Sequence, residues 1–215
     1  MSTLARTLAN AAFGPGALGY ALLTGNAPWR HDSRSMAALV PGPRVLDLGV
    51  GPGTSALEMA RAAPAHRHVG LDRSPAMLRL AAAASRRARL DLSLVRADAL
   101  ALPFRSGTLD GVTGHSLLYL IADPLAALQE ARRVLRPGGA VAFLEPRAGR
   151  CEFPAALAAG PRCAVSMILW QAMARLHRRF DESTLPALLR AAGLIEPRAW
   201  PVLFGYGVMA TAVAP

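Results

Sequence analysis

The chain has 215 residues, the length of one compact domain, and all 24 of its basic residues are arginine. A chain without lysine cannot build a P-loop, the nucleotide-binding lysine of a protein kinase or the Schiff base of a pyridoxal-phosphate enzyme. Its hydrophobic residues make up 53% of the sequence and can bury a large core, which excludes disorder.

The formal net charge of +10 is compatible with a nucleic-acid partner, with an anionic membrane surface, or with a charge that is merely solvated. The arginines are spread along the chain, and their clusters are short and far apart, at 86–89, 132–136 and 175–179. This spread favours the solvated surface and argues against nucleic acid. Docking to an anionic membrane surface stays open as an alternative.

The two cysteines, Cys151 and Cys163, are too few for a disulfide framework or a four-ligand zinc site. We therefore expect reduced thiols, a cytoplasmic location and no metal. The first 13 residues lack the continuous apolar core of a signal peptide. The longest apolar candidate, 163–170, is far shorter than the roughly 18 residues of a membrane span, so the sequence predicts a chain that is not integral to a membrane.

The first 43 residues are predicted to form an N-terminal helical cap, with one helix at 2–12 and a second segment at 20–40 that is broken near Pro28. From 44 to 146 short apolar runs alternate with amphipathic stretches. Strands are expected near 45–48, 69–71, 92–95, 109–113 and 140–144, and helices near 54–63, 74–87 and 123–135. This alternation predicts a parallel sheet with helices on both faces.

Residues 147–180 interrupt the alternation as a helical insertion. The run 163–176 is apolar nearly all round, so this helix is expected to be buried or to cover an apolar ligand. A last amphipathic helix at 181–192 precedes two extended runs, 195–204 and 206–213, that are typical of an antiparallel hairpin. The prediction is a single α/β domain, a Rossmann-like, doubly wound sheet of seven strands, mostly parallel with a C-terminal antiparallel hairpin.

Glycines alternate in the stretch Asp47-Leu48-Gly49-Val50-Gly51-Pro52-Gly53, between the first core strand and a helix. Glycines at such a turn let the backbone come close to a ligand, and the free N–H groups of the helix start suit an anionic group. A dinucleotide fingerprint, G-x-G-x-x-G, would need a third glycine at the position of Thr54. The spacing therefore disfavours a nicotinamide-dependent oxidoreductase, the competing enzyme class on this fold.

Further motifs follow this loop in order: Gly70-Leu71-Asp72-Arg73-Ser74, Arg96-Ala97-Asp98-Ala99, Leu109-Asp110-Gly111-Val112 and Val134-Leu135-Arg136-Pro137-Gly138-Gly139. With them, residues 44–146 resemble the core of the class I S-adenosylmethionine (SAM)-dependent methyltransferases. The likeness is to the small-molecule branch that includes the ubiquinone/menaquinone methyltransferases and the bacterial phospholipid N-methyltransferases. It implies a SAM-binding core at 44–146 and an acceptor side built by 147–180.

The resemblance also implies which residues hold SAM. It places Asp72 on the ribose hydroxyls and Asp98 on the adenine amine, while Asp47 organises the glycine loop and reaches the methionine part only indirectly. The cofactor-binding residues that it implies are Asp47, Gly49, Gly51, Gly53, Asp72, Arg73, Met77, Asp98, Ala99 and His115.

Methyl transfer from SAM is an in-line displacement at a carbon that already carries its activation, so the protein mainly aligns the acceptor and excludes water. A base is needed only when the acceptor must lose a proton. His115, at the end of the fourth core strand, is the histidine placed to act as that base, and a packing or SAM-contacting role is its alternative. Tyr20, Tyr119 and Glu145 are lesser catalytic candidates.

The acceptor is predicted to be a small, apolar or lipid-like molecule, because the apolar run 163–176 lies where the resembling family builds its acceptor pocket. In the N-terminal segment 1–43, Ala21 follows Tyr20 where that family has a tyrosine–aspartate pair, which weakens the case for a quinone. A phosphatidylethanolamine N-methyltransferase at the membrane surface and a SAM-binding module without catalysis are the alternatives. A nucleic-acid methyltransferase is disfavoured, because no Asn/Asp-Pro-Pro-aromatic motif follows the fourth strand.

Overall fold

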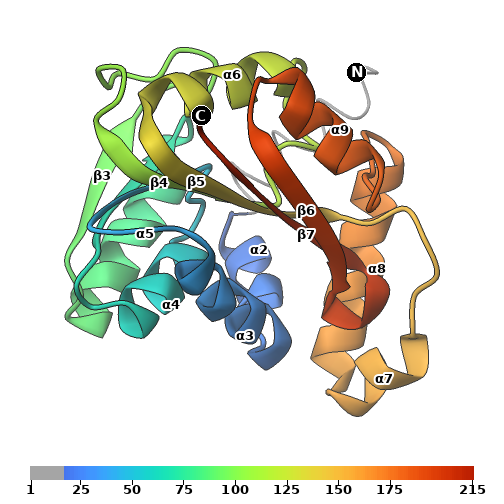
Figure 1. The fold of residues 1–215 in the computed structure, drawn as a ribbon. Coiled ribbons are helices and arrows are strands. Elements are labelled where there is room, and N and C mark those ends of the chain that lie inside the picture. The colour runs from blue at the N-terminus through green and yellow to red at the C-terminus, as the bar shows by residue number, and fades with distance from the viewer. Residues whose placement is uncertain (1–16) are drawn as a thin grey trace.

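The computed structural model describes residues 17–215, apart from the side chains of Ala17, Tyr20, Leu23 and Thr24. Its centre is a seven-stranded sheet in the order β3-β2-β1-β4-β5-β7-β6 (Figure 1). The strands are β1 (Arg44–Leu48), β2 (Arg67–Asp72), β3 (Leu92–Arg96), β4 (Leu109–His115), β5 (Leu135–Pro146), β6 (Ile195–Val202) and β7 (Gly207–Val213). Only β7 runs against its neighbours, β5 and β6, which confirms the predicted sheet with its closing hairpin.

Helices cover both faces of this sheet, as right-handed crossovers between parallel strands require. Figure 1 shows α3 (Ala27–Met36), α4 (Thr54–Ala62) and α5 (Pro75–Ala88) on one face, and α6 (Pro124–Val134) and α9 (Thr184–Ala191) on the other. Beside the sheet lie α2 (Ala17–Thr24), α7 (Phe153–Ala158) and α8 (Pro161–Arg175), and short 3-10 turns form η1 (Ala37–Leu39) and η2 (Leu203–Gly205).

Three helices begin with a polar side chain followed by a proline in the first turn. Asn26, Ser74 and Asp123 each accept the backbone N–H three residues further on, at 3.0–3.3 Å. Such caps satisfy donors that the helix itself leaves free. Pro28 therefore starts α3 instead of breaking a helix, and the expected break falls at Gly25 and Asn26. The helix expected at 2–12 lies outside the described residues.

Residues 136–139 form a bulge at the start of β5. Helix α6 ends at Val134 and β5 begins at the next residue, but the pairing of β4 with β5 shifts register between Leu109 and Gly111. Between them, the buried Asp110 accepts the backbone N–H of Arg44 at 2.8 Å and forms an ion pair with Arg136 at 2.6 Å. Asp110 is thus structural.

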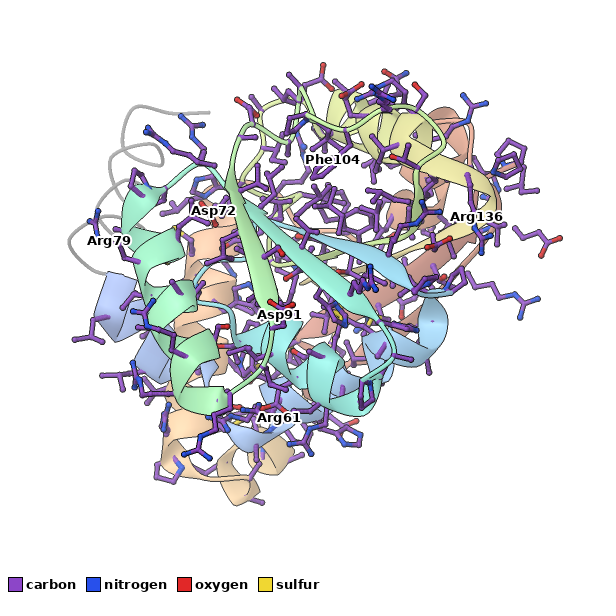
Figure 2. The ribbon with its side chains drawn as sticks, turned by 90° about the vertical axis from the view of Figure 1, so that its left-hand side faces the viewer. Arg61, Asp72, Arg79, Asp91, Phe104 and Arg136 are labelled. Carbon is purple, nitrogen blue, oxygen red and sulfur yellow. The ribbon has the colours of Figure 1, made fainter. Side chains whose placement is uncertain are left out.

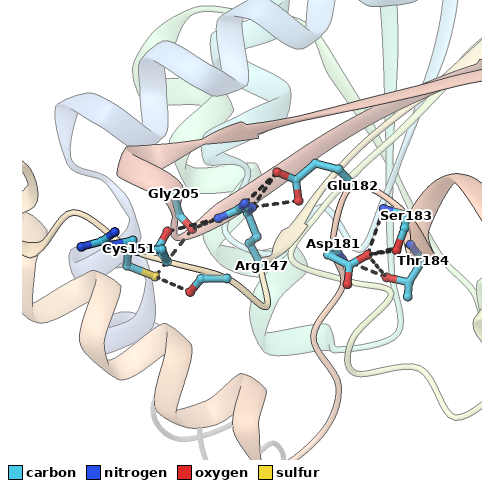
Figure 3. Close-up of polar contacts among 9 residues, drawn as sticks. Arg147, Cys151, Asp181, Glu182, Ser183, Thr184 and Gly205 are labelled. Carbon is cyan, nitrogen blue, oxygen red and sulfur yellow. Dashed lines mark hydrogen bonds and ion pairs between the residues drawn. The ribbon is translucent and has the colours of Figure 1, made fainter.

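The helical insertion leaves and re-enters the fold at one place (Figure 3). At its start, Arg147 donates to both carboxylate oxygens of Glu182, which lies just after its end, at 2.7–3.0 Å. The backbone N–H of Ala148 donates to the carbonyl of Phe180 at 2.6 Å. A planar guanidinium bound to a carboxylate in this way is geometrically specific. Residues 148–180 therefore form an excursion whose two ends are held together.

Helix α8 is buried on one face only, whereas the sequence predicted a helix that is buried or covers a ligand. Its residues Cys163, Met167 and Trp170 are buried, whereas Ile168 and Leu169 are 48% and 50% exposed on the opposite side. An apolar helix that was expected to be buried or to cover a ligand thus packs through one face only. Among the described residues, no helix has the length and apolar character needed to cross a bilayer.

Candidate functional site

The loop between β1 and α4 holds three glycines in the left-handed region, with φ of +64° at Gly49, +54° at Gly51 and +87° at Gly53. A side chain on Gly49 would place its Cβ 2.6 Å from a methyl group of Leu117, so that position excludes one. A Cβ on Gly51 would find its nearest atom only 3.8 Å away, at the carbonyl oxygen of Gly49. The predicted glycine loop is therefore formed, and space in front of Gly51 lets a ligand approach the backbone.

Asp72 fixes this loop to the end of β2. Its Oδ2 accepts the N–H of Gly51 at 2.9 Å, and its Oδ1 accepts the N–H of Ser74 at 2.8 Å. Burial raises the pKa of Asp72, and these two backbone donors oppose the rise. Figure 2 shows Asp72 at the end of its strand, beside the start of α5. Each carboxylate oxygen keeps a further lone pair, so Asp72 can accept hydroxyl groups from a ligand.

Asp47 lies one residue before the end of β1 and is buried. The hydroxyl of Thr113, on the neighbouring β4, donates to its Oδ1 at 2.9 Å. Burial raises the pKa of Asp47 to about 7, the nearby carboxylate of Asp72 adds to the rise, and the Thr113 hydrogen bond opposes it. A cationic ligand at this place would favour the ionised form of Asp47.

Three aromatic rings from three different elements meet beside Asp47. The ring centroid of Trp29, on α3, lies 4.5 Å from that of His115 at the end of β4 and 4.7 Å from that of Trp170 on α8. His115 shares a hydrogen bond between its Nδ1 and the hydroxyl of Ser116. Its Nε2 and the Nε1 atoms of both tryptophans are buried and have no hydrogen-bond partner among the described residues. We call these three residues the aromatic cluster.

Burial lowers the pKa of His115 to about 3 in this arrangement. The imidazole is therefore neutral across the physiological pH range. A neutral ring offers one donor and one acceptor nitrogen, and a base with so low a pKa is a weak proton acceptor. The expectation that His115 serves as a base remains a prediction, and its geometry suits hydrogen bonding to a neutral polar group.

A pocket lies between the glycine loop and two members of the aromatic cluster, Trp29 and His115. It is small, about 30 Å³, whereas sites for small molecules usually measure about 300–1,000 Å³. Helix α3 is held against α4 on one side of the pocket, because the hydroxyls of Ser33 and Ser55 lie 3.1 Å apart and Arg34 forms an ion pair with Glu58 of α4. The pocket is therefore smaller than a ligand of nucleoside size. The lining residues are Trp29, Ser33, Asp47, Gly49, Val50, Gly51, Pro52, Thr54, Ser55 and His115.

The other predicted cofactor residues lie around the carboxyl ends of β2 and β3 and do not line this pocket. Asp98 is exposed, and its Oδ1 accepts the N–H of Leu100 at 3.0 Å. Ala99 and Met77 are buried, whereas the side chain of Arg73 is exposed. Their roles toward SAM stay predictions.

The two tyrosines named as catalytic candidates are not brought to the pocket by any described contact. Tyr119 is buried, and its ring meets that of His177 edge to face, with centroids 5.9 Å apart. Tyr20 belongs to α2, but its side chain lies outside the description. Their catalytic roles stay predictions as well.

Glu145 has a clear position, under the loop that follows β4. Its fully buried carboxyl accepts the backbone N–H groups of Leu117 and Leu118 through Oε1 and that of Tyr119 through Oε2, at 2.8–3.2 Å. Burial raises the pKa of Glu145 to about 8 despite these donors. The carboxyl group holds the backbone directly after His115, so Glu145 is a positioning residue for that side of the site.

Sequence comparison identifies the family. The model of a family described as a methyltransferase domain matches residues 45–139. A demethylmenaquinone methyltransferase of Mycolicibacterium paratuberculosis is 33% identical over 173 residues, which cover 80% of this chain and 67% of that protein. The chain belongs to the SAM-dependent methyltransferases.

Other relatives define the extent of the match. A demethylmenaquinone methyltransferase of Thermus thermophilus is 39% identical over 117 residues, or 54% of this chain and 53% of that protein. The chain spans about half the length of several such curated relatives. A SAM-dependent methyltransferase from Aquifex aeolicus shares the fold, with a TM-score of 0.66 and 18% identity, covering 86% of this chain and 89% of that one.

Several residues of the site received no role from the sequence. Ser33 and Trp29 come to the pocket because α3 folds over α4. Thr113 comes beside Asp47 because β4 pairs with β1. For Ser55 a signal existed, because it directly follows the glycine loop at the start of a helix. For Ser33 and Trp29 there was none, since a lone serine or tryptophan on a short helix is usually part of a packed surface.

The contacts of Glu145 predict a loss of stability in Glu145→Gln. The amide places an NH₂ group where one carboxyl oxygen accepted a backbone N–H, and an amide nitrogen cannot accept, so a buried donor loses its partner. We expect the free energy of unfolding to fall by about 1–3 kcal/mol. Urea unfolding at pH 7 measures it. Glu152→Gln, at an exposed glutamate, should change stability by less than about 0.5 kcal/mol. A Glu145→Gln protein as stable as the wild type would contradict the role.

Proposed function

We propose that the chain binds SAM at the glycine loop and transfers its methyl group to a small, apolar or lipid-like acceptor, with a quinone-type ring as the leading candidate. The observation that carries the proposal is the meeting of the glycine loop, Asp47 and two members of the aromatic cluster, Trp29 and His115, around one pocket. Two relatives named demethylmenaquinone methyltransferases support the choice of ring.

The residues present fit the chemistry of SAM. The open side of Gly51 and the start of α4 can receive a carboxylate, because backbone N–H groups at a helix start favour negative charge. Asp72 has lone pairs free for ribose hydroxyls, and Asp47 can meet the positive charge of the ligand. The pocket is too small for SAM, so we infer that α3 moves away from α4 as SAM enters and then covers it.

The acceptor follows from the aromatic cluster. Indole rings provide an apolar wall for a planar ring, and their N–H groups prefer a partner when they are buried. Leaving such groups unpaired is costly, and a ligand oxygen between Trp29, His115 and Trp170 would pair them. An acceptor with an apolar body and a carbonyl or hydroxyl oxygen supplies both contacts.

SAM supplies a methyl group that is already activated by its sulfonium sulfur, so the chain has to orient and enclose. Trp29 and Ser33 on α3 exclude water from the reacting centre when α3 is closed. The neutral imidazole of His115 holds the polar atom of the acceptor. Glu145 keeps the loop after His115 in place through three backbone hydrogen bonds. Orientation of this kind can contribute about 7–11 kcal/mol to lowering a barrier.

Titration calorimetry with SAM tests the cofactor site. We expect Asp72→Asn to bind SAM about tenfold or more weakly than the wild type, since charge-assisted hydrogen bonds to the ligand are lost. Asp91→Asn is the matched control, because Asp91 is exposed and precedes β3 at the opposite end of the outer strands (Figure 2). Equal affinity of the two variants for SAM, or no binding of SAM by the wild type, would contradict the proposed SAM site.

The pKa of Asp47 predicts a pH dependence of SAM affinity. Below pH 7 the carboxyl is largely protonated, and binding a cation must first remove that proton. Affinity should therefore rise with pH through about 7, by up to about tenfold per pH unit below the pKa, and then level off. The ammonium group of SAM itself titrates at about 7.7–8.0. The comparison with Asp47→Asn isolates the carboxylate, and parallel pH profiles of the two proteins would refute the role.

Turnover of SAM with a panel of acceptors tests the reaction. Quinones and small phenols should be methylated. Phosphatidylethanolamine is included in the panel to test the alternative of a phospholipid N-methyltransferase. Trp29→Phe removes the indole N–H and the five-membered ring that carries it, so it should raise the KM for the acceptor severalfold. Methylation of phosphatidylethanolamine alone would refute the quinone, and SAM binding without turnover of any acceptor would identify a non-catalytic module.

A further inference from the structure

The exposed large apolar side chains are concentrated on three neighbouring helices. Of the ten such residues in the described part of the chain, eight belong to α2, α7 or α8 with the residue that ends it. Helix α8 packs against both α7 and α2 (Figure 1). The eight are Leu18, Leu22, Phe153, Leu157, Val165, Ile168, Leu169 and Leu176, each 43–62% exposed.

On α8 these residues form one continuous stripe. Val165, Ile168, Leu169 and Leu176 recur at the three- and four-residue spacing of one helix face, and the opposite face packs against the protein. Arg162 and Arg175 are exposed and fall on the two margins of the stripe. We call this stripe, together with Phe153 and Leu157 of α7, the insertion face.

The charge around the insertion face is mainly positive, although the exposed acid Glu152 lies directly before Phe153 at the start of α7. Residues 153–180 contain four arginines, Arg162, Arg175, Arg178 and Arg179, all of them exposed, and not one aspartate or glutamate. An apolar stripe with arginines at its edges matches a helix that lies in the interface of a bilayer, where the apolar side chains enter the acyl region and the guanidinium groups stay among the headgroups.

We propose that the insertion face docks on the surface of an anionic lipid bilayer. Contiguous exposed apolar patches on a folded protein mark binding surfaces. The arginines beside this patch favour an anionic lipid surface as the partner, because their charge is complementary to that of the headgroups. A second copy of the chain is a poorer occupant, because a two-fold contact would bring the four arginines of each copy together, and Glu152 alone does not balance them.

The position of α8 would bring a docked membrane close to the aromatic cluster. Trp170 lies on the inner side of α8 and contacts Trp29, while Ile168 and Leu169 lie on its outer side. One helix thus separates the aromatic cluster from the bilayer. An acceptor dissolved in the membrane would have only this helix to pass. Docking itself does not depend on methyl transfer, so it can be tested whether or not the proposed reaction is found.

Vesicle flotation tests the docking. The wild type should float with vesicles of phosphatidylglycerol and phosphatidylcholine in low salt, and bind less to vesicles of phosphatidylcholine alone or in high salt. The double variant Ile168→Gln/Leu169→Gln should bind about tenfold or more weakly, since it removes the apolar centre of the stripe. The double variant Arg162→Gln/Arg175→Gln should lose about fivefold in affinity per arginine on the anionic vesicles.

Matched controls distinguish docking through the insertion face from non-specific hydrophobic or electrostatic binding to vesicles. Leu100→Gln/Ile195→Gln changes two exposed apolar residues elsewhere, and Arg86→Gln/Arg87→Gln removes the same charge from α5. Both controls should float like the wild type, and circular dichroism confirms that all variants are folded. Failure of the wild type to float, or equal losses in controls and test variants, would overturn the proposal. A wild-type dimer in light scattering that Ile168→Gln/Leu169→Gln dissociates would instead assign the face to a second copy.

Discussion

The site depends on one topological constraint, the reversal of strand order at β1. The chain moves outward from β1 through β2 to β3 and then returns to place β4 on the other side of β1. The connections that leave β1 and β4 therefore diverge to opposite faces, and a crevice opens between them at the carboxyl ends of the strands. Asp47 and Thr113 meet at that point across the strand pair, and the glycine loop and His115 leave from it. Any ligand of this fold is received there.

The parts of the site that are local in sequence were predictable. Glycines at alternate positions after an apolar strand specify a turn with positive φ, and Ser74 before a proline specifies a helix start, because each depends on the conformation of a few adjacent residues. The order of motifs along the chain then placed Asp72 and the glycine loop at the same edge of the sheet. The hydrogen bond between them shows that this inference is physically sound.

The parts that depend on packing between distant helices were not predictable. Trp29 and Trp170 are 141 positions apart, and their contact exists because α3 and α8 approach over the same crevice. The all-round apolar character of α8 gave no indication of which face would be buried. Likewise Pro28 was compatible with a break or a start, and only the side chain of Asn26 as a cap decides between them. Periodicity describes one helix at a time, whereas a pocket is a property of several.

The closure of the insertion by Arg147 and Glu182 has an evolutionary consequence. A segment whose ends are held together transmits little of its length or shape to the strands on either side, because the distance that it must span is fixed by the ion pair. Insertions and deletions between them can alter the outer faces of α7 and α8 while the sheet keeps its register. The strand ends that carry Asp47, Asp72 and the glycine loop stay in place through such changes, because they lie outside the closed segment.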